Sequence, residues 1–355
     1  MPSLFDPLTL GDLALPNRIV MAPLTRLRAS AGHVPNRLMA EYYAQRASAG
    51  LIISEGVPVS PSGVGYEGVP GVWSADQAEG WKQVTQAVHA RGGRIFMQIW
   101  HVGRISDPVF LGGELPVAPS AIAPEGTVSL LRPQRPFVTP RALATEEVEA
   151  VVEDFRRAAD NAQAAGFDGV QLHAANGYLI DQFLQDGSNH RTDRYGGSIE
   201  NRARLLLEAT DAAVSVFGAG RVGVHLAPRA DVHSMGDSDR AATFGYAVRE
   251  LGRRNVAFVS AREHQAPDSL GPDLKTAFGG AYVANESFTA ETAQAALDAG
   301  WADAVAFGKA FIANPDLPER LRAGAPLNPP RPETFYGHGP EGYVDYPALG
   351  ETAEA

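Results

Sequence analysis

Short apolar runs, rich in β-branched residues, recur along the whole chain. Eight of them stand at residues 19–23, 51–55, 94–101, 169–173, 222–228, 256–261, 281–285 and 304–308. Within each run, apolar residues follow one another directly instead of alternating with polar ones. This pattern is typical of strands that are buried on both faces. The runs therefore predict the strands of a parallel sheet.

Segments with a helical period separate most of these runs. Apolar residues recur about every 3.6 positions over residues 38–49, 75–90, 145–165, 198–217, 239–253 and 289–299. Four glycines stand where a left-handed C-cap is expected, namely Gly50, Gly166, Gly252 and Gly300. Two segments begin with a threonine and an acidic first turn, at Thr145 and Thr289.

Strands that alternate with helices favour a closed α/β fold, the (β/α)8 TIM barrel, here as a single domain over residues 1–355. An open doubly wound sheet is the alternative that the same alternation allows. Two segments depart from a plain barrel. Residues 8–17 carry turn signals and are expected to form an N-terminal hairpin that caps the barrel floor. Residues 102–141 are rich in proline and are expected to make a long excursion over the C-terminal mouth after the third strand.

Composition and charge exclude several classes of function. The chain has no cysteine, which excludes disulfides, cysteine-ligated metal sites and a cysteine nucleophile, and we expect no metal. A net charge of −11 argues against a nucleic-acid partner. No apolar stretch reaches about 18 residues, and the first residues lack the basic and apolar parts of a signal peptide. We therefore expect a cytoplasmic protein without a membrane partner.

Polar residues at the predicted strand ends suggest chemistry, because catalytic groups of such barrels lie there. His173 and Asn176 could both donate to one substrate oxygen, and Tyr178 could supply a proton. The alternative is that His173 is a core residue whose hydrogen bonds are made within the protein. Gly308 and Lys309, followed by a helix, could bind a phosphate. The alternative is that Gly308 only allows a turn of the backbone and that Lys309 only faces solvent.

Motifs along nearly the whole chain resemble one family, the Old Yellow Enzymes, and keep its order. They are residues 21–26 (MAPLTR), 42–47 (YYAQRA), 50–55 (GLIISE), 98–104 (QIWHVGR), 165–170 (AGFDGV), 173–184, 195–202 (YGGSIENR), 314–317 (NPDL), 335–337 (FYG) and 342–347 (GYVDYP). The resemblance implies an FMN-dependent (β/α)8 barrel that takes electrons from NADPH or NADH and reduces activated alkenes. Such an enzyme acts on small molecules, as a monomer or a homodimer.

The same resemblance assigns roles to individual residues. Those implied to bind noncovalent FMN are Pro23, Leu24, Thr25, Gly56, Gln98, His225, Asn285, Gly308 and Lys309. His173 and Asn176 match the pair that binds the substrate oxygen, and Tyr178 matches the proton donor. Tyr66, Trp100 and Tyr336 match positions around the substrate.

Three departures from the family pattern concern the cofactor. His225 stands where the family usually has an arginine, Lys309 replaces another arginine, and Ala284–Asn285 replace a frequent pair of glycines. A histidine has an ordinary pKa of about 6.5, so we expect His225 to titrate between about pH 6 and 8 beside the flavin. The rival expectation is that Arg229 or Arg262 supplies the missing charge.

Three other functions fit parts of the sequence. A flavin dienoyl-CoA reductase would need a cysteine-bound cluster and an extra domain, which this chain lacks. An intact Tyr178 argues against a flavin protein that binds phenols or steroids without turnover, but His225 keeps this alternative open. A Schiff-base aldolase would need a strand-end lysine, and the setting of Lys309 suits a phosphate better.

Overall fold

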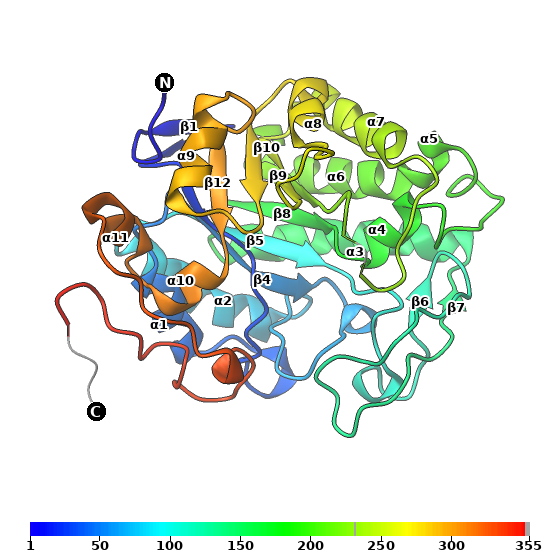
Figure 1. Cartoon of the computed structure of the whole chain (residues 1–355). Coiled ribbons are helices and arrows are strands. Elements are labelled where there is room, and N and C mark those ends of the chain that lie inside the picture. Colours follow the sequence, from blue (N-terminus) through cyan, green and yellow to red (C-terminus); the bar gives the residue numbers. More distant parts are fainter. Residues whose placement is uncertain (231, 352–355) are drawn as a thin grey trace.

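A closed barrel of eight parallel strands forms the centre of the computed structural model, which describes residues 1–230 and 232–351 (Figure 1). The strands are β3 (Ile19–Met21), β4 (Leu51–Pro58), β5 (Ile95–Trp100), β8 (Gly169–Ala174), β9 (Val222–Leu226), β10 (Phe258–Arg262), β11 (Tyr282–Asn285) and β12 (Ala304–Phe307). They pair in chain order, and β12 closes the ring on β3. All eight predicted strands and the barrel are confirmed, and the open sheet is not.

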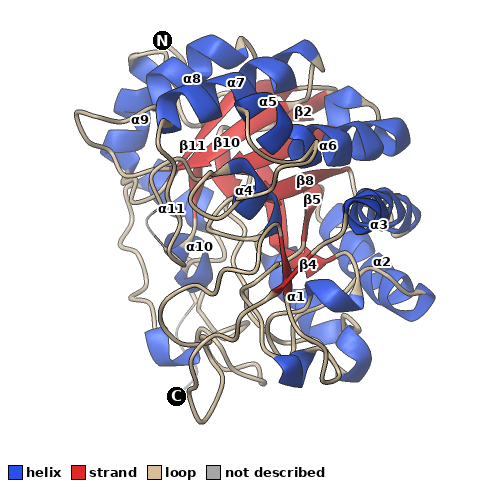
Figure 2. Ribbon diagram, turned by 90° about the vertical axis from the view of Figure 1, so that its right-hand side faces the viewer, coloured by secondary structure: helices blue, strands red, loops and turns tan. Residues whose placement is uncertain are grey.

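Helices surround the barrel on its outer side (Figure 2). They are α1 (Arg37–Gln45), α2 (Ala75–His89), α3 (Thr145–Ala164), α4 (Leu179–Leu184), α5 (Ile199–Arg202), α6 (Arg204–Phe217), α7 (Arg240–Arg253), α8 (Gly271–Phe278), α9 (Ala290–Asp298), α10 (Lys309–Ala313) and α11 (Leu317–Ala323). Short 3-10 turns occupy Ala31–His33, Pro61–Gly63, Pro108–Phe110, Ala219–Arg221 and Pro332–Thr334. No helix in the described part of the chain is both long and apolar enough to cross a bilayer.

The predicted helix ends are partly right. Gly166 and Gly300 have the left-handed conformation expected of them, with φ of 84° and 74°. Gly252 lies inside α7, and the left-handed residue after that helix is Asn255. Gly50 follows α1 at a distance and donates instead to the carbonyl of Ile19 at the start of β3. These two predicted caps are wrong because a glycine suits close backbone approach as well as a C-cap.

The predicted helix starts are also partly right. Thr289 caps α9 by accepting from the backbone N–H of Thr292. Thr145 is the first residue of α3, so the cap position is Ala144, whose N–H donates to the carboxylate of Glu147. The helix predicted over residues 198–217 is divided into α5 and α6. Helix α8 was not predicted, because it is short and begins with Gly271 and Pro272, both poor helix formers.

The predicted hairpin closes the barrel floor. Strands β1 (Leu8–Leu10) and β2 (Leu13–Leu15) pair antiparallel, and three of their leucines are buried. Those leucines pack in one cluster with Phe96 and Phe258, which project from β5 and β10. Burial of large apolar side chains at this end supplies stability, and leaves the opposite end of the barrel for chemistry.

The excursion after β5 covers the mouth, as expected. It carries the short strand β6 (Val117–Ala118), which pairs with β7 (Arg141–Ala142). Between them, Val128 and Phe137 are buried in a cluster that includes Trp100 and Tyr178. The segment therefore forms one wall over two of the residues predicted to meet a substrate.

Candidate functional site

A cavity of about 520 Å³ opens at the carboxyl ends of the strands. Every barrel strand or the turn after it contributes to its lining, because the carboxyl ends of parallel strands meet at one rim. Predicted residues that line it are Pro23, Leu24, Thr25, Gly56, Gln98, Trp100, His173, Asn176, Tyr178, His225, Asn285, Gly308, Lys309 and Tyr336. The volume is typical of a cofactor or small-molecule site.

A chain of buried polar side chains crosses the base of this cavity. Nε2 of Gln98 donates to Oε1 of Gln171 at 2.9 Å, and Nε2 of Gln171 donates to Oγ of Ser260 at 3.1 Å. Oγ of Ser260 lies 2.8 Å from Nδ1 of His225. Strand register explains the chain, since Gln98 is paired with Gln171 and Ser260 with His225 on neighbouring strands. Gln171 and Ser260 were not predicted, and only their inward place in the register identifies them.

Both cavity histidines are uncharged near neutral pH. Burial lowers the pKa of His225 to about 3, with a smaller contribution from Arg262. Burial also lowers the pKa of His173 well below its ordinary value, helped by His225 and Arg262. His225 is therefore neutral between about pH 6 and 8 in the protein alone, because the barrel interior disfavours its charged form, and its titration beside a reduced flavin stays a prediction.

Nδ1 of His173 is buried and has no hydrogen-bond partner among the residues that the structure describes, and the same holds for Nε1 of Trp100. The two rings are stacked, with their centroids 5.5 Å apart. A buried polar nitrogen without a partner costs about 1–3 kcal/mol. Within this cavity, a ligand oxygen could satisfy the imidazole.

Tyr178 stands edge-on to the imidazole of His173, with ring centroids 5.1 Å apart. Its hydroxyl lies 3.1 Å from the hydroxyl of Tyr66. Burial and the nearby Tyr66 raise the pKa of Tyr178 well above its ordinary value, so the phenol stays protonated. Tyr66 itself is buried and is not among the described residues that line the cavity. Its hydroxyl contacts that of Tyr178.

The loop after β11 differs from the expected pattern. Asn285 ends that strand, and its side-chain Nδ2 donates to the carbonyl of Ala306 at 2.9 Å. The backbone positions that favour glycine are the next two, where Glu286 has φ of 100° and Ser287 has φ of 60°. The glycine-like positions are thus Glu286 and Ser287, not Ala284 and Asn285. Both line the cavity, and neither was predicted.

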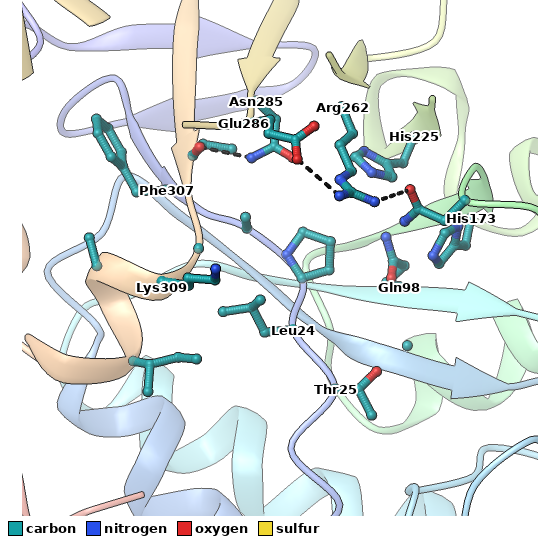
Figure 3. Close-up of a pocket in the computed structure, with 18 of the residues that line it drawn as sticks. Leu24, Thr25, Gln98, His173, His225, Arg262, Asn285, Glu286, Phe307 and Lys309 are labelled. Carbon is teal, nitrogen blue, oxygen red and sulfur yellow. Dashed lines mark hydrogen bonds and ion pairs between the residues drawn. The ribbon is translucent and has the colours of Figure 1, made fainter. Parts of the chain in front are cut away.

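Two glycines serve the cavity in different ways. A Cβ at Gly56 would lie 2.8 Å from the indole of Trp100, so this position must lack a side chain for the indole to pack. A Cβ at Gly308 would meet only the side chain of Leu24, at 3.5 Å or more. Gly308 is therefore not required by packing, and the space beside it belongs to the cavity. Lys309 follows as the exposed first residue of α10 (Figure 3).

Comparison with known proteins gives this geometry a context. The model of the NADH:flavin oxidoreductase / NADH oxidase family matches residues 3–328. The chain belongs to this family, the Old Yellow Enzymes. It is 41% identical to 12-oxophytodienoate reductase 1 of Oryza sativa subsp. japonica, with 99% of this chain and 94% of that protein covered.

Solved structures of family members agree in fold over nearly their full lengths. The old yellow enzyme homologue from Zymomonas mobilis is 47% identical, with a TM-score of 0.95 over 98% of this chain and 100% of that one. Morphinone reductase in complex with tetrahydroNAD is 50% identical, with a TM-score of 0.95 over 98% of each chain. The protein is therefore an NAD(P)H-dependent flavin oxidoreductase, and its cofactor is FMN.

The residues of the cavity fit the cofactor of the Old Yellow Enzyme family. The amide of Gln98 uses its Nε2 within the protein, which leaves its carbonyl oxygen as an acceptor for a ring N–H. The open space beside Gly308, next to the ammonium group of Lys309, suits a phosphate. Lysine offers a point charge there without the planar fork of the arginine that the family usually has.

The carboxyl-terminal tail completes the cavity. Phe335 and Tyr336 line it, and Tyr336 is 52% exposed. Arg26 and Arg28 fix this segment, because both are buried and both donate to the carbonyl oxygen of Phe335. Both guanidinium groups also lie over the ring of Tyr343. These arginines are structural, and they act on the site by holding the tail.

Proposed function

We propose that this protein is an ene-reductase that reduces the C=C bond of α,β-unsaturated carbonyl compounds and nitroalkenes. One observation carries the proposal. The cavity brings together an unpartnered nitrogen of His173, the amide of Asn176 and the protonated hydroxyl of Tyr178. Two donors for an oxygen beside one acid are what such a reduction requires.

Residues of the barrel rim would hold FMN in this cavity. Pro23, Leu24, Thr25, Gly56 and Gln98 would contact the ring system, and His225 would lie beside it. The backbone at Asn285, with Gly308 and Lys309, would hold the phosphate. The chemistry that FMN supplies when bound is hydride delivery to the alkene β-carbon, after reduction by NADH or NADPH.

His173 and Asn176 would bind and polarise the substrate oxygen. A neutral imidazole still has one N–H to donate, and the amide of Asn176 has two. Donation to the carbonyl or nitro oxygen draws electron density from the double bond, so the β-carbon becomes electrophilic. Trp100 and Tyr336 would flank the substrate, since both line the cavity.

Tyr178 would protonate the α-carbon. Its raised pKa keeps the proton on the hydroxyl at neutral pH, which makes it an acid and not a phenolate. Tyr66 would act indirectly, because its hydroxyl fixes the position of the Tyr178 hydroxyl at 3.1 Å. Tyr66 is thus a positioning residue and not a substrate contact.

Isotope labelling tests the reaction directly. Under anaerobic conditions, 2-cyclohexenone and NADPH that carries deuterium at C4 of the nicotinamide should give cyclohexanone with deuterium at the β-carbon. NADH in the same assay defines the preferred reductant. Cyclohexenol as the product would overturn the proposal, because it would mean hydride transfer to the carbonyl carbon. A flavin that is bleached by both nicotinamides but never reoxidised by any activated alkene would indicate a ligand-binding protein instead.

A further inference from the structure

Arg262, the last residue of β10, bridges two other residues of the cavity. One terminal nitrogen of its guanidinium group donates to Oδ1 of Asn176 at 3.0 Å, and the other pairs with Oε1 of Glu286 at 2.9 Å (Figure 3). Its side chain lines the cavity and is 35% exposed. Three different strand ends are thereby tied together through one side chain.

This bridge decides which way the amide of Asn176 faces. A guanidinium group only donates hydrogen bonds, so it can hold the amide oxygen but not the NH2 group. With Oδ1 occupied by Arg262, the two N–H donors of Asn176 are left for the cavity. The backbone of Asn176 is fixed as well, with φ of 58° and its carbonyl 2.8 Å from Nδ1 of His233.

Glu286 holds the other side of the guanidinium group. Its carboxylate also lies 3.8 Å from Nε2 of His264, so it is fixed by two neighbours. The backbone of Glu286, at φ of 100°, turns this carboxylate into the cavity at a position that usually favours glycine. Strain of this kind persists only where the surrounding structure holds it.

Arg262 is also a cation at its end of the cavity, where it balances the carboxylate of Glu286. His173 and His225 are buried and neutral, and Lys309 lies elsewhere in the cavity, beside Leu24 (Figure 3). The other arginine considered from the sequence, Arg229, is directed away. It pairs with Asp268 at 2.8 Å and Glu263 at 3.7 Å, and it is not among the described residues that line the cavity.

We propose that Arg262 is a positioning residue that turns the NH2 group of Asn176 toward the ligand oxygen, and whose charge, by balancing Glu286, lets the site accept an anionic oxygen. This rests on the proposed function, because the ligand oxygen is the one that His173 and Asn176 would bind. Without Arg262, the carboxylate of Glu286 would repel a phenolate or an enolate oxygen, but not a neutral carbonyl oxygen of similar shape.

Two probes separate the effect of charge from the effect of position. Para-hydroxybenzaldehyde presents an ionisable phenol, and cyclohexanone presents a neutral carbonyl. Both are titrated into the FMN-loaded protein and followed by flavin absorbance. Arg262→Ala should weaken binding of the phenol by about thirtyfold or more and of the ketone by about threefold, since the unbalanced carboxylate of Glu286 then repels the phenolate in addition to the loss of an oriented donor. Arg229→Ala is the matched control and should match the wild type.

A double-mutant cycle tests whether Arg262 acts through Asn176. In an Asn176→Ala background, Arg262→Ala should no longer change the affinity for cyclohexanone, while the affinity for the phenol should still fall. Arg262→Lys should keep most of the wild-type affinity for the phenol, because it still balances the charge of Glu286. Equal losses of ketone affinity with and without Asn176 would overturn the positioning role.

The outcomes separate this inference from the proposed function. A wild-type protein without FMN, or one that activated alkenes do not reoxidise, would refute the proposed function. A wild type that turns over, with Arg262→Ala binding both probes like Arg229→Ala, would overturn this inference alone. If Arg262→Ala loses its flavin, Arg262→Gln serves instead, because it keeps a donor without the charge. An unchanged ratio of phenol to ketone affinity in that variant would also overturn the inference.

Discussion

The two ends of the barrel use the same eight strands for opposite purposes. At the floor, the hairpin leucines pack against Phe96 and Phe258, whose rings are 6.0 Å apart. At the mouth, the same strands present amides, imidazoles and a guanidinium group, and Nδ1 of His173 has no hydrogen-bond partner in the described part of the chain. The floor gains stability from apolar burial, whereas the mouth keeps polar groups unsatisfied at a cost in stability.

This difference shows that the floor of the barrel serves stability, whereas the mouth serves ligand binding. A donor at the mouth that lacks a partner lowers the stability of the free protein. It raises the affinity for a ligand, because the ligand restores the hydrogen bond. Substitutions at the floor should therefore change stability and leave chemistry intact. Substitutions at the mouth should change chemistry and leave stability nearly intact.

The largest effect is expected at the floor. Phe258→Ala should lower the free energy of unfolding by about 3–5 kcal/mol, because a fully buried ring leaves a cavity. Tyr336→Ala at the mouth is the control, and should cost less than about 1 kcal/mol because its side chain is half exposed. Urea unfolding measures both values. Similar losses in the two variants would contradict the contrast between floor and mouth.

Tyr178→Phe should leave stability nearly unchanged and slow the chemistry. Reoxidation of the reduced flavin by 2-cyclohexenone should fall about a hundredfold, since general acid catalysis is lost. Reduction by the nicotinamide should be unaffected, because it needs no proton on carbon. Stopped-flow absorbance separates the two half-reactions. Tyr66→Phe, which keeps the acid but loses its partner, should slow reoxidation much less, and equal slowing of both half-reactions in Tyr178→Phe would indicate a structural tyrosine.

Removal of a single donor at the mouth should have a smaller effect. His173→Ala should weaken the binding of a para-substituted phenol by about 1–3 kcal/mol, because the phenolate loses one of its two partners. The long-wavelength absorbance that such a phenol produces over oxidised flavin should disappear with it. His101→Gln is a useful comparison, because His101 is also buried but is not among the described residues that line the cavity. An unchanged affinity in His173→Ala would mean that the ligand oxygen binds elsewhere.

The smallest expected effect concerns pH. The pKa of His225 falls from an unfolded value near 6.5 to about 3 in the folded protein, so only the unfolded chain takes up this proton just below pH 6.5. Stability should therefore fall as the pH falls from about 6.5 toward 3, and be unaffected by this group above that range. Between pH 6.5 and 5.5, the wild type should lose about 1 kcal/mol more than His225→Gln.

Urea unfolding of the protein freed of FMN, at several pH values, measures this difference. His338→Gln, on the exposed tail, is the control and should follow the wild type. Parallel curves for the wild type and His225→Gln would show that His225 becomes protonated in the folded state near neutral pH.

The sequence by itself determined the architecture. Continuous apolar runs specify strands buried on both faces, and their alternation with helical periods leaves a barrel as the main solution. It also determined most of the residues at the rim, because strand ends are fixed once the strands are known. His173, Asn176 and Tyr178 are close in the chain, so their meeting in one cavity follows from local geometry.

Only the tertiary structure decided how distant residues act on one another. Tyr66 and Tyr178 are 112 positions apart, and only the folded chain brings their hydroxyls within 3.1 Å of each other. Burial decided that His225 is neutral, since a pKa depends on what surrounds a group and not on its identity alone. The bridge from Glu286 through Arg262 to Asn176 joins three strand ends. No local pattern encodes it, because closing the barrel is what brings those ends together.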